Sequence, residues 1–392
     1  MSPSSFVDVA EDSPFSIHNI PFGVFSTSSD RTPRMGAAIG TYIVDLKALT
    51  LAGILAHCEC AFPHEVLTGT TLNDFAALGR KVVSAVRLFV QSLLLDTTSI
   101  LRVDAHLRDQ CLTKQSNATM HLPFAIGDFT DFTSSRTHAK NTHSSHGSGA
   151  NMFNPPRAAA GRASSILPSG VPIVRPVGHL FDKKGNPYVG PSNELDVELE
   201  LGFFVGVPSK HFQRIHITQA EDHIFGVVLL NDWSTRDVQR GEDHPFSAFN
   251  AKNFATSISP WVVTLDALEP FRVKPDPRDD RDMLPYLTEP DDSTYDIRVC
   301  FEWNLAHDRG VVRVTTSELK HAYWSFKQMD PSSLCSLVEA TKNNTKPFVF
   351  PRDTTRSYLE DGDQVVFTAW CGALGSGVGF GECSTVILPA RE

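Results

Sequence analysis

The chain has 392 residues, enough to bury a sizeable core and to form two domains. Its 45 acidic and 35 basic residues give a formal net charge of -10, which argues against nucleic acid or an anionic membrane as a partner. The seven cysteines are scattered without a Cys-x-x-Cys pair, so we expect reduced thiols rather than a zinc cluster or a disulfide scaffold.

The first residues lack the basic and apolar regions of a secretory signal, and no apolar segment approaches the length of a membrane span. We therefore expect a soluble, cytoplasmic protein that acts on small molecules. Residues 1 to about 120 contain strand-like pieces at 23–26, 37–40 and 42–46, followed by one convincing helix. This pattern predicts an N-terminal domain over residues 1–120.

The predicted helix begins near Thr71, with Asp74 three residues later as the acid of a capping box. Apolar residues recur at helical spacing over the following turns, namely Leu72, Phe75, Leu78, Val82, Val86, Phe89 and Leu93. Such a stripe indicates a helix that packs one face against the core.

From residue 121 onward, short strand patterns are separated by Gly, Pro and Asn, which predicts a mainly β catalytic domain over residues 121–392. Residues 134–165 are rich in Ser, Gly, Ala and His and indicate a loop beside the active site. His143 and His146 are candidate metal ligands in this loop, although its composition favours a polar loop with incidental histidines.

The most informative segment is residues 193–201, in which carboxylates alternate with apolar residues. Strand geometry places the apolar residues on one face and four carboxylates on the other, namely Glu194, Asp196, Glu198 and Glu200. Glu198 and Glu200 can bind one divalent cation, which offsets the repulsion between them. The alternative is an acidic face exposed to solvent.

Two further carboxylates favour the cation site. Asp232 ends a short apolar run, residues 227–232, that is typical of a buried strand. Asp131 lies seven residues before His138, so one segment supplies a carboxylate and a candidate general base. Because all these ligands are oxygens, they favour Mg2+ or Ca2+ over zinc.

Several ordered motifs give the chain a resemblance to the fumarylacetoacetase family, whose namesake enzyme ends tyrosine breakdown by hydrolysing a carbon–carbon bond. They include Gly-Asp-Phe-Thr-Asp-Phe at 127–132 and Gly-Arg-Ala-Ser-Ser at 161–165. The other matching segments are 9–13, 21–27, 120–123, 134–139, 193–201, 203–206 and 231–239. The resemblance covers nearly the full length.

The resemblance implies a mainly β fold, with a small SH3-like N-terminal barrel, a C-terminal mixed β-roll and a homodimer. It implies that the cation is held by Asp131, Glu198, Glu200 and Asp232, with Lys252 and Thr256 at positions that stabilise a neighbouring cation. His138 corresponds to the general base, which Glu339 orients. Arg236, Gln239 and Lys252 correspond to the groups that stabilise the developing oxyanion, and Gln239 also contacts substrate.

The implied chemistry is hydrolysis of a 1,3-dicarbonyl. The cation polarises the dicarbonyl, His138 with Glu339 deprotonates a water, and attack on the carbonyl expels a carbanion. The substrate-facing positions depart from the family, because Thr133, Ala159 and Asp243 stand where it has tyrosines. The arginine that grips a substrate carboxylate has no convincing equivalent in the shortened loop, which predicts a less anionic substrate.

The segment between Trp324 and Glu339 is also shorter than in the family, which has an additional strand and a Gly-Thr-x-x-Gly loop there. Removing that strand should expose backbone groups and apolar surface unless neighbouring segments fill in. The shortening reflects either divergence of this chain or an error in its gene model.

The leading hypothesis is a metal-dependent C–C bond hydrolase of specialised metabolism, with altered specificity for a 1,3-dicarbonyl. Within enzymes, the alternatives are a true fumarylacetoacetase of tyrosine catabolism and a decarboxylase, isomerase or C–C bond-forming enzyme that uses the same enolate. A non-catalytic paralogue is the alternative from another class. The retained carboxylates, together with His138, Glu339 and Lys252, argue against it.

Overall fold

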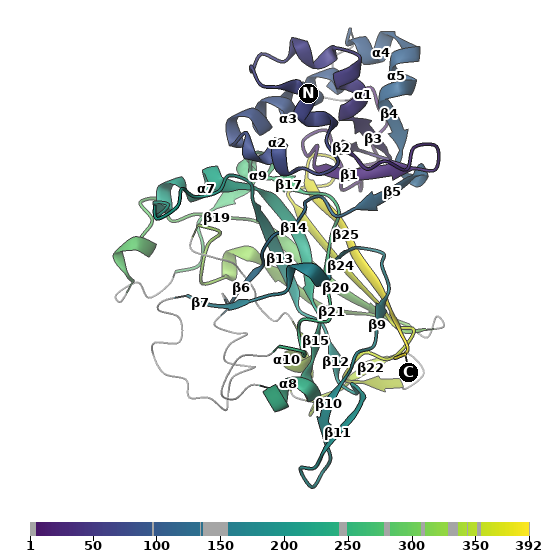
Figure 1. Ribbon diagram of the computed structural model, residues 1–392, viewed down its shortest axis with the longest axis vertical. Helices are drawn as coiled ribbons and strands as arrows, with labels where there is room; N and C mark the ends of the chain where they lie inside the picture. The colour runs from purple at the N-terminus through teal and green to yellow at the C-terminus, as the bar shows by residue number, and fades with distance from the viewer. Residues whose placement is uncertain are drawn as a thin grey trace.

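The computed structural model describes residues 5–95, 98–133, 135, 156–242, 249–277, 283–306, 310–327, 336–342, 344–350 and 354–391. The N-terminal part contains a five-stranded antiparallel sheet, a half-barrel with the order β4-β3-β2-β1-β5 (Figure 1). Its strands are β1 (Phe22–Thr27), β2 (Arg34–Ile39), β3 (Tyr42–Asp45), β4 (Leu112–Lys114) and β5 (Ala118–His121).

Helices cover this sheet on the side away from the rest of the chain (Figure 1). They are α1 (Leu46–Leu51), α2 (Asn73–Ala77), α3 (Arg80–Leu95), α4 (Ile100–Val103) and α5 (Ala105–Cys111). The prediction of one continuous helix from Thr71 is wrong, because Gly79 adopts a left-handed conformation with φ of +85° and separates α2 from α3. The predicted capping box is also wrong, since Leu72 is the N-cap of α2 and makes no side-chain capping bond. The apolar stripe itself packs on the core as predicted, because its members are either buried, namely Leu72, Phe75, Val86 and Leu93, or partly buried against the same core, namely Leu78, Val82 and Phe89. Helix α3 also buries Val83, Val90 and Leu94, which the prediction did not include.

The C-terminal part is built on two sheets that pack face to face. One has the order β21-β20-β24-β25-β9, and the other has the order β13-β14-β16-β8 with β17 paired to β14. The strands of the first are β9 (Ile173–Val174), β20 (Arg298–Asn304), β21 (Val311–Glu318), β24 (Gln364–Cys371) and β25 (Val378–Leu388). Those of the second are β8 (Ile166–Pro168), β13 (Leu199–Val205), β14 (Ile224–Asp232), β16 (Thr256–Ile258) and β17 (Val263–Thr264). The mainly β fold class is confirmed.

Strand β14 is buried along its whole length because both of its faces are covered. Val227 and Leu229 belong to the core between the two C-terminal sheets. Val228 and Leu230 point the other way and share a core with Phe22 and Phe75 of the N-terminal part. The two parts therefore share one apolar interior, and our domain boundary at residue 120 stays a prediction.

Shorter elements surround this frame. The pairs are β6 (Thr130–Thr133) with β7 (Arg157–Ala160), β10 (Val177–Phe181) with β11 (Pro187–Pro191), β12 (Leu195–Asp196) with β15 (Ser234–Thr235), β18 (Arg272–Val273) with β19 (Thr294–Tyr295), and β22 (Phe348–Phe350) with β23 (Thr354–Arg356). The helices are α7 (Ala220–His223), α8 (Arg236–Glu242), α9 (Leu265–Leu268) and α10 (Leu337–Ala340). In Figure 1 the β10–β11 hairpin extends from the end of the molecule opposite the N-terminal helices.

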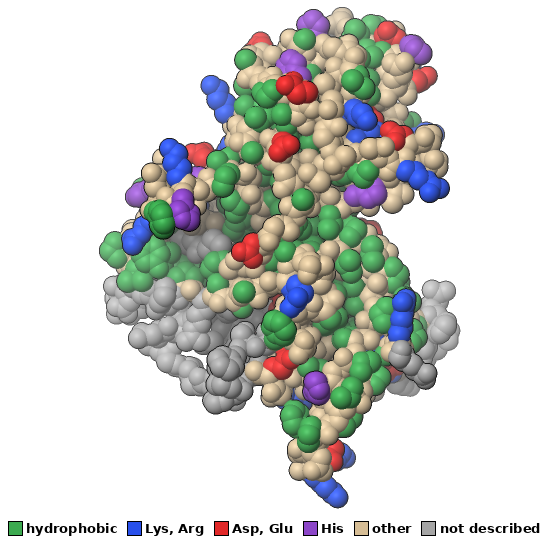
Figure 2. Space-filling model, viewed as in Figure 1, with side chains coloured by type: hydrophobic (Ala, Val, Ile, Leu, Met, Phe, Trp, Pro, Cys, Tyr) green, Lys and Arg blue, Asp and Glu red, His purple; other side chains and the backbone are tan. Residues whose placement is uncertain are grey.

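One stretch, Arg80–Val103, is long and apolar enough to cross a membrane by length and composition alone. By that measure, our expectation that no segment approaches this length does not hold. The burial of one face of α3 in the core accounts for much of its apolar character. On the face shown in Figure 2, acidic and basic side chains are scattered among each other.

We expect Gly79→Ala to lower the free energy of unfolding by about 1–2 kcal/mol, because an alanine at this positive φ is strained. Gly127→Ala is the matched control, since its φ is not positive and nothing lies within 4 Å of the added carbon. The control should be neutral or slightly stabilising. Urea unfolding of both variants measures the difference, and equal effects would contradict this account of the helix break.

Candidate active site

The candidate site lies at one end of the β13-β14-β16 sheet. The backbone N–H of Asp232 donates to the carbonyl oxygen of Glu198 at 3.2 Å, so these residues face each other across β13 and β14. Asp232 in turn pairs with Thr256 on β16. Directly opposed residues of antiparallel strands project to the same face. The ladder therefore aligns Glu198, Asp232 and Thr256 in one row, and all three are buried.

Glu200 completes a carboxylate cluster beside this row. One carboxylate oxygen each from Glu198, Glu200 and Asp232 lie within 4.8 Å of one another. The Lys252 ammonium contacts two of these groups, at 2.5 Å from Glu198 Oε2 and 2.6 Å from Asp232 Oδ2. The predicted proximity of the three carboxylates and Lys252 is confirmed.

Charge crowding changes the protonation of this cluster. Burial raises the pKa of Asp232 to about 7, and the charges of Glu198 and Asp131 add to the effect while Lys252 opposes it. Burial also raises the pKa of Glu200 well above its usual value, with Asp131 and Asp232 as the strongest charged contributors. A set of close, hard oxygen donors with surplus negative charge fits a divalent cation such as Mg2+ or Ca2+.

Asp131 reaches the cluster from a separate hairpin. In the β6–β7 pair, Asp131 lies directly opposite Ala159, and Thr133 lies opposite Arg157. The charge of Asp131 raises the pKa of both Glu200 and Asp232, so its carboxylate lies near theirs. The structure thus places Asp131 directly opposite Ala159, and the roles that the resemblance gives these two residues stay predictions.

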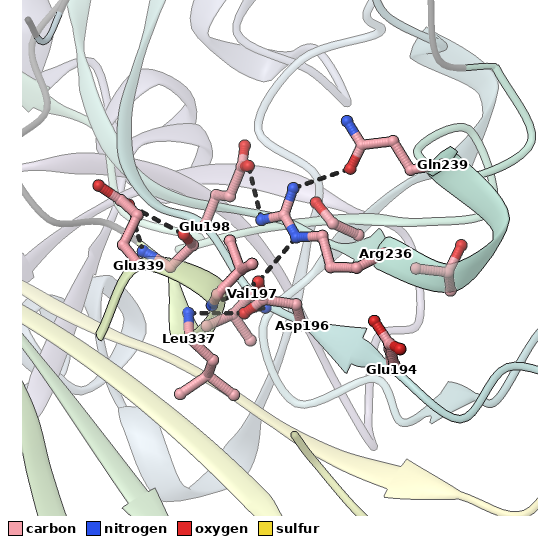
Figure 3. A network of polar contacts seen from close by, with 12 residues as sticks. Glu194, Asp196, Val197, Glu198, Arg236, Gln239, Leu337 and Glu339 are labelled. Carbon is pink, nitrogen blue, oxygen red and sulfur yellow. Dashed lines mark hydrogen bonds and ion pairs between the residues drawn. The ribbon is translucent and has the colours of Figure 1, made fainter. Parts of the chain in front are cut away.

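Arg236 links the acidic segment to helix α8 (Figure 3). Its Nε donates to Asp196 Oδ2 at 2.7 Å, and its Nη2 donates to Glu198 Oε1 at 2.8 Å. These two carboxylates raise the pKa of Arg236, although burial opposes this, so the group is a permanent cation. Glu198 therefore lies between two positive side chains, Arg236 and Lys252.

Gln239 lies one turn along α8 from Arg236, and its Oε1 accepts from Arg236 Nη1 at 2.9 Å. A guanidinium can only donate, so this bond assigns the amide oxygen of Gln239 to the arginine side. The amide nitrogen consequently points away from Arg236, as Figure 3 shows. The Gln239 side chain is thereby oriented to donate hydrogen bonds on the side away from Arg236.

Glu339 approaches the same region from α10. Its Oε2 accepts from the backbone N–H of Ser336 at 3.1 Å and from the Ser336 hydroxyl at 2.9 Å, a capping box that fixes the first turn. Ser336 also forms an isolated β-bridge with Glu198. Glu339 is therefore brought to the acidic segment, although no local pattern around it indicates this.

The expectation of four equivalent carboxylates on one face is wrong in detail. The strand breaks at Val197, so that β12 pairs with β15 whereas β13 pairs with β14. Glu194 instead pairs with Arg240 at 2.7 Å, on the partly exposed side of α8. The apolar residues behave as predicted, since the large core between the sheets contains Leu195, Val197, Leu199 and Leu201.

Several predicted positions lie outside the described residues. They are His138, His143, His146, Asp243 and the side chain of Thr133. The shortened segment before α10 is described only up to Lys327 and from Ser336. Within the described residues, the buried Trp324 Nε1 has no hydrogen-bond partner.

Comparison with known proteins gives consistent matches along the chain. The fumarylacetoacetase N-terminal family model matches residues 18–123, and the fumarylacetoacetate (FAA) hydrolase C-terminal model matches residues 128–330. Fumarylacetoacetase of Rattus norvegicus is 40% identical over 420 residues, covering 98% of this chain and 99% of the relative. The enzyme of Homo sapiens is 39% identical over the same length, with the same coverage. The alignments exceed the 392 residues of this chain, so both relatives contain residues that it lacks.

Among solved structures, the fumarylacetoacetate hydrolase of psychrophilic Exiguobacterium antarcticum aligns with 95% of this chain and 100% of its own. Its TM-score is 0.49 at 14% identity, which supports no inference. The sequence relatives define the class, which is a hydrolase acting on carbon–carbon bonds in ketonic substances. More particularly, the chain belongs to the fumarylacetoacetase family.

Without a divalent cation, we expect the stability of the protein to fall as the pH rises from about 4 to about 7. The pKa of Asp232, about 7 in the folded protein, exceeds its usual value of 3.8, so the folded protein holds a proton that the unfolded chain releases. A bound cation favours the carboxylate, so Mg2+ should raise the melting temperature more at pH 8 than at pH 5.

Thermal unfolding in EDTA and in Mg2+ over this pH range measures both effects. Asp232→Asn is the control, because it removes the titrating group at nearly constant shape. An unchanged pH slope in this variant would contradict the assignment.

Proposed function

We propose that this protein catalyses metal-dependent hydrolysis of a 1,3-dicarbonyl, at the bond between one carbonyl carbon and the carbon that lies between the two carbonyls, with a specificity that differs from that of fumarylacetoacetase. The observation that carries the proposal is the cluster of Glu198, Glu200 and Asp232, with ligand oxygens within 4.8 Å of one another. Two permanent cations, Lys252 and Arg236, lie against the same carboxylates.

In this proposal, Asp131, Glu198, Glu200 and Asp232 hold Mg2+ or Ca2+. When bound, the cation would polarise the carbonyl oxygens of the substrate. Lys252 donates to Glu198 and Asp232 and opposes the rise in the pKa of Asp232, and its ammonium supplies a fixed positive charge beside the reacting oxygens. Thr256 lies next to Asp232 on the neighbouring strand and limits the space around that carboxylate.

Arg236 and Gln239 supply hydrogen-bond donors to the substrate. Because Arg236 fixes the amide of Gln239, the Gln239 N–H groups meet a developing oxyanion without a prior rotation. Donors that are already oriented cost no reorganisation when charge develops. Gln239 therefore both binds substrate and stabilises the charge that forms during attack by water.

We assign the general base to His138 and its orientation to Glu339. Glu339 is buried, and the Ser336 capping box limits its rotation, which suits a carboxylate that orients an imidazole. His138 takes a proton from water, and the water oxygen attacks the carbonyl carbon. The carbon–carbon bond then breaks, and its electron pair goes to the carbon that lies between the two carbonyls. That carbon then takes the proton held by His138, so that the products are a ketone and a carboxylic acid and the imidazole is neutral again.

Thr133, Ala159 and Asp243 are the positions at which we place the change in specificity. Ala159 pairs with Asp131 and offers only a methyl group beside a cation ligand. Losing tyrosine hydroxyls there removes hydrogen bonds to a polar substrate and leaves additional room. A substrate with fewer carboxylates than fumarylacetoacetate fits this arrangement. The homodimer implied by the resemblance and the cytoplasmic location expected from the lack of a signal pattern stay predictions.

Fumarylacetoacetate itself is the second candidate substrate. The relatives that carry the name fumarylacetoacetase are 39% and 40% identical over almost the whole chain, which favours the same reaction. In this case other residues must pair with the second carboxylate of the substrate.

We expect purified protein with Mg2+ to cleave a simple acylpyruvate at least about tenfold more efficiently than fumarylacetoacetate, followed as loss of the enol absorbance. Glu200→Gln should lower kcat/KM by at least about 100-fold, because it removes a charged ligand while keeping the shape. Asp363→Asn is the control for general stability, since this buried carboxylate bonds Trp303 and Ala306 away from the site.

Preferred turnover of fumarylacetoacetate would refute the altered specificity and support the second candidate. Full activity of Glu200→Gln would refute the cation site itself.

A further inference from the structure

Asp196 is a fully buried carboxylate whose two oxygens accept four hydrogen bonds from three parts of the chain. Oδ2 accepts from Arg236 Nε at 2.7 Å and from the backbone N–H of Val338 at 3.1 Å. Oδ1 accepts from the N–H groups of Leu337 and Val197, both at 2.7 Å. Four donors match the acceptor capacity of an ionised carboxylate.

These contacts connect two groups that the neighbouring Glu198 also joins, through its ion pair with Arg236 and its β-bridge with Ser336. Arg236 begins α8 and holds Gln239, whereas Leu337 and Val338 form the first turn of α10, which carries Glu339 (Figure 3). The N–H groups of a first helical turn have no partners within the helix, so an external acceptor fixes the helix end. Asp196 is that acceptor, and it lies 141 residues from Leu337 in sequence.

We propose that Asp196 is a positioning residue that sets the distance between the oxyanion donors on α8 and the Glu339 carboxylate on α10. The inference rests on the proposed function, because it assigns catalytic roles to the groups being held. Asp196 itself touches neither substrate nor cation in this account. It acts by fixing Arg236 on one side and the start of α10 on the other.

The chemistry of the four bonds makes charge as important as shape. In Asp196→Asn, an amide N–H2 replaces one carboxylate oxygen and meets Arg236 Nε or a helix N–H, both of which are donors. Two donors cannot bond each other, so either Arg236 or α10 must shift. Displacement of a catalytic group by about 1 Å can cost about 100-fold in rate.

The central experiment compares Asp196→Asn with Asp363→Asn. Asp363 is the matched control, because it is equally buried and accepts from Trp303 Nε1 and the N–H groups of Ala306 and Glu360 without touching α8 or α10. We expect Asp196→Asn to lower kcat for the cleaved dicarbonyl by about 10- to 100-fold with KM changed less than about threefold. Asp363→Asn should lower the melting temperature and leave kcat within about twofold.

Hydrogen–deuterium exchange provides a readout that does not depend on activity. In the wild-type protein, the amides of Leu337 and Val338 should exchange slowly, because their acceptor is buried. Asp196→Asn should speed exchange in residues 336–342 at least about tenfold, whereas Asp363→Asn should leave this segment unchanged. A double-mutant cycle with Arg236→Lys should be strongly non-additive in kcat, since both changes break one bond.

The outcomes separate the inference from the proposed function. A wild-type protein that cleaves no dicarbonyl refutes the proposed function and the catalytic consequence of Asp196. Unprotected Leu337 and Val338 amides in the wild type refute the anchoring even if Asp196→Asn fails to fold. An active wild type whose kcat is unchanged in Asp196→Asn reduces Asp196 to a structural residue and overturns the inference.

Discussion

Compensation of buried negative charge is the constraint on which the site depends. Asp196, Glu198, Glu200, Asp232 and Asp131 converge where β13 begins and β14 ends. Among the described residues, Arg236 and Lys252 form ion pairs with Asp196, Glu198 and Asp232. An unpaired charge in such a place costs several kcal/mol. Among the described residues, these two cations are fewer than the carboxylates, and protons or a divalent ion can neutralise the difference. The raised pKa values of Asp232 and Glu200 indicate neutralisation by protons. The set of oxygen donors is suited to neutralisation by a divalent ion.

The sheet architecture makes this concentration of charge possible. Strand β14 is apolar on both faces up to Asn231 and is held between two cores, so its end cannot move to relieve repulsion. The backbone pairing aligns Glu198, Asp232 and Thr256 regardless of their side chains. Strand pairing and apolar burial therefore supply the free energy that keeps like charges together, which is how folded proteins hold strained functional sites.

How much the sequence predicts depends on whether a contact is local. The period of two along residues 193–201 and the abrupt acid after residues 227–231 predict the apolar faces and the carboxylate cluster. The same period misses the break at Val197, because the change of strand partner from β15 to β14 has no local signal. The break between α2 and α3 did have a signal, namely Gly79, but the apolar spacing continues across it. The contact of Asp196 with Leu337 spans 141 residues, so neither propensity nor periodicity can indicate it.

In the β6–β7 pair, the position of Asp131 does not depend on which side chain stands at residue 159. Asp131 and Ala159 are opposite each other, so a proposed cation ligand and a substrate-facing position share one rung of the ladder. Backbone hydrogen bonds hold that rung, and they do not depend on the side chain at residue 159. A tyrosine-to-alanine difference there changes the space and hydrogen bonding beside the cation ligand without moving the ligand. In the proposed function, specificity can thus diverge while the carboxylate cluster is retained, because the residue at position 159 can change without moving Asp131.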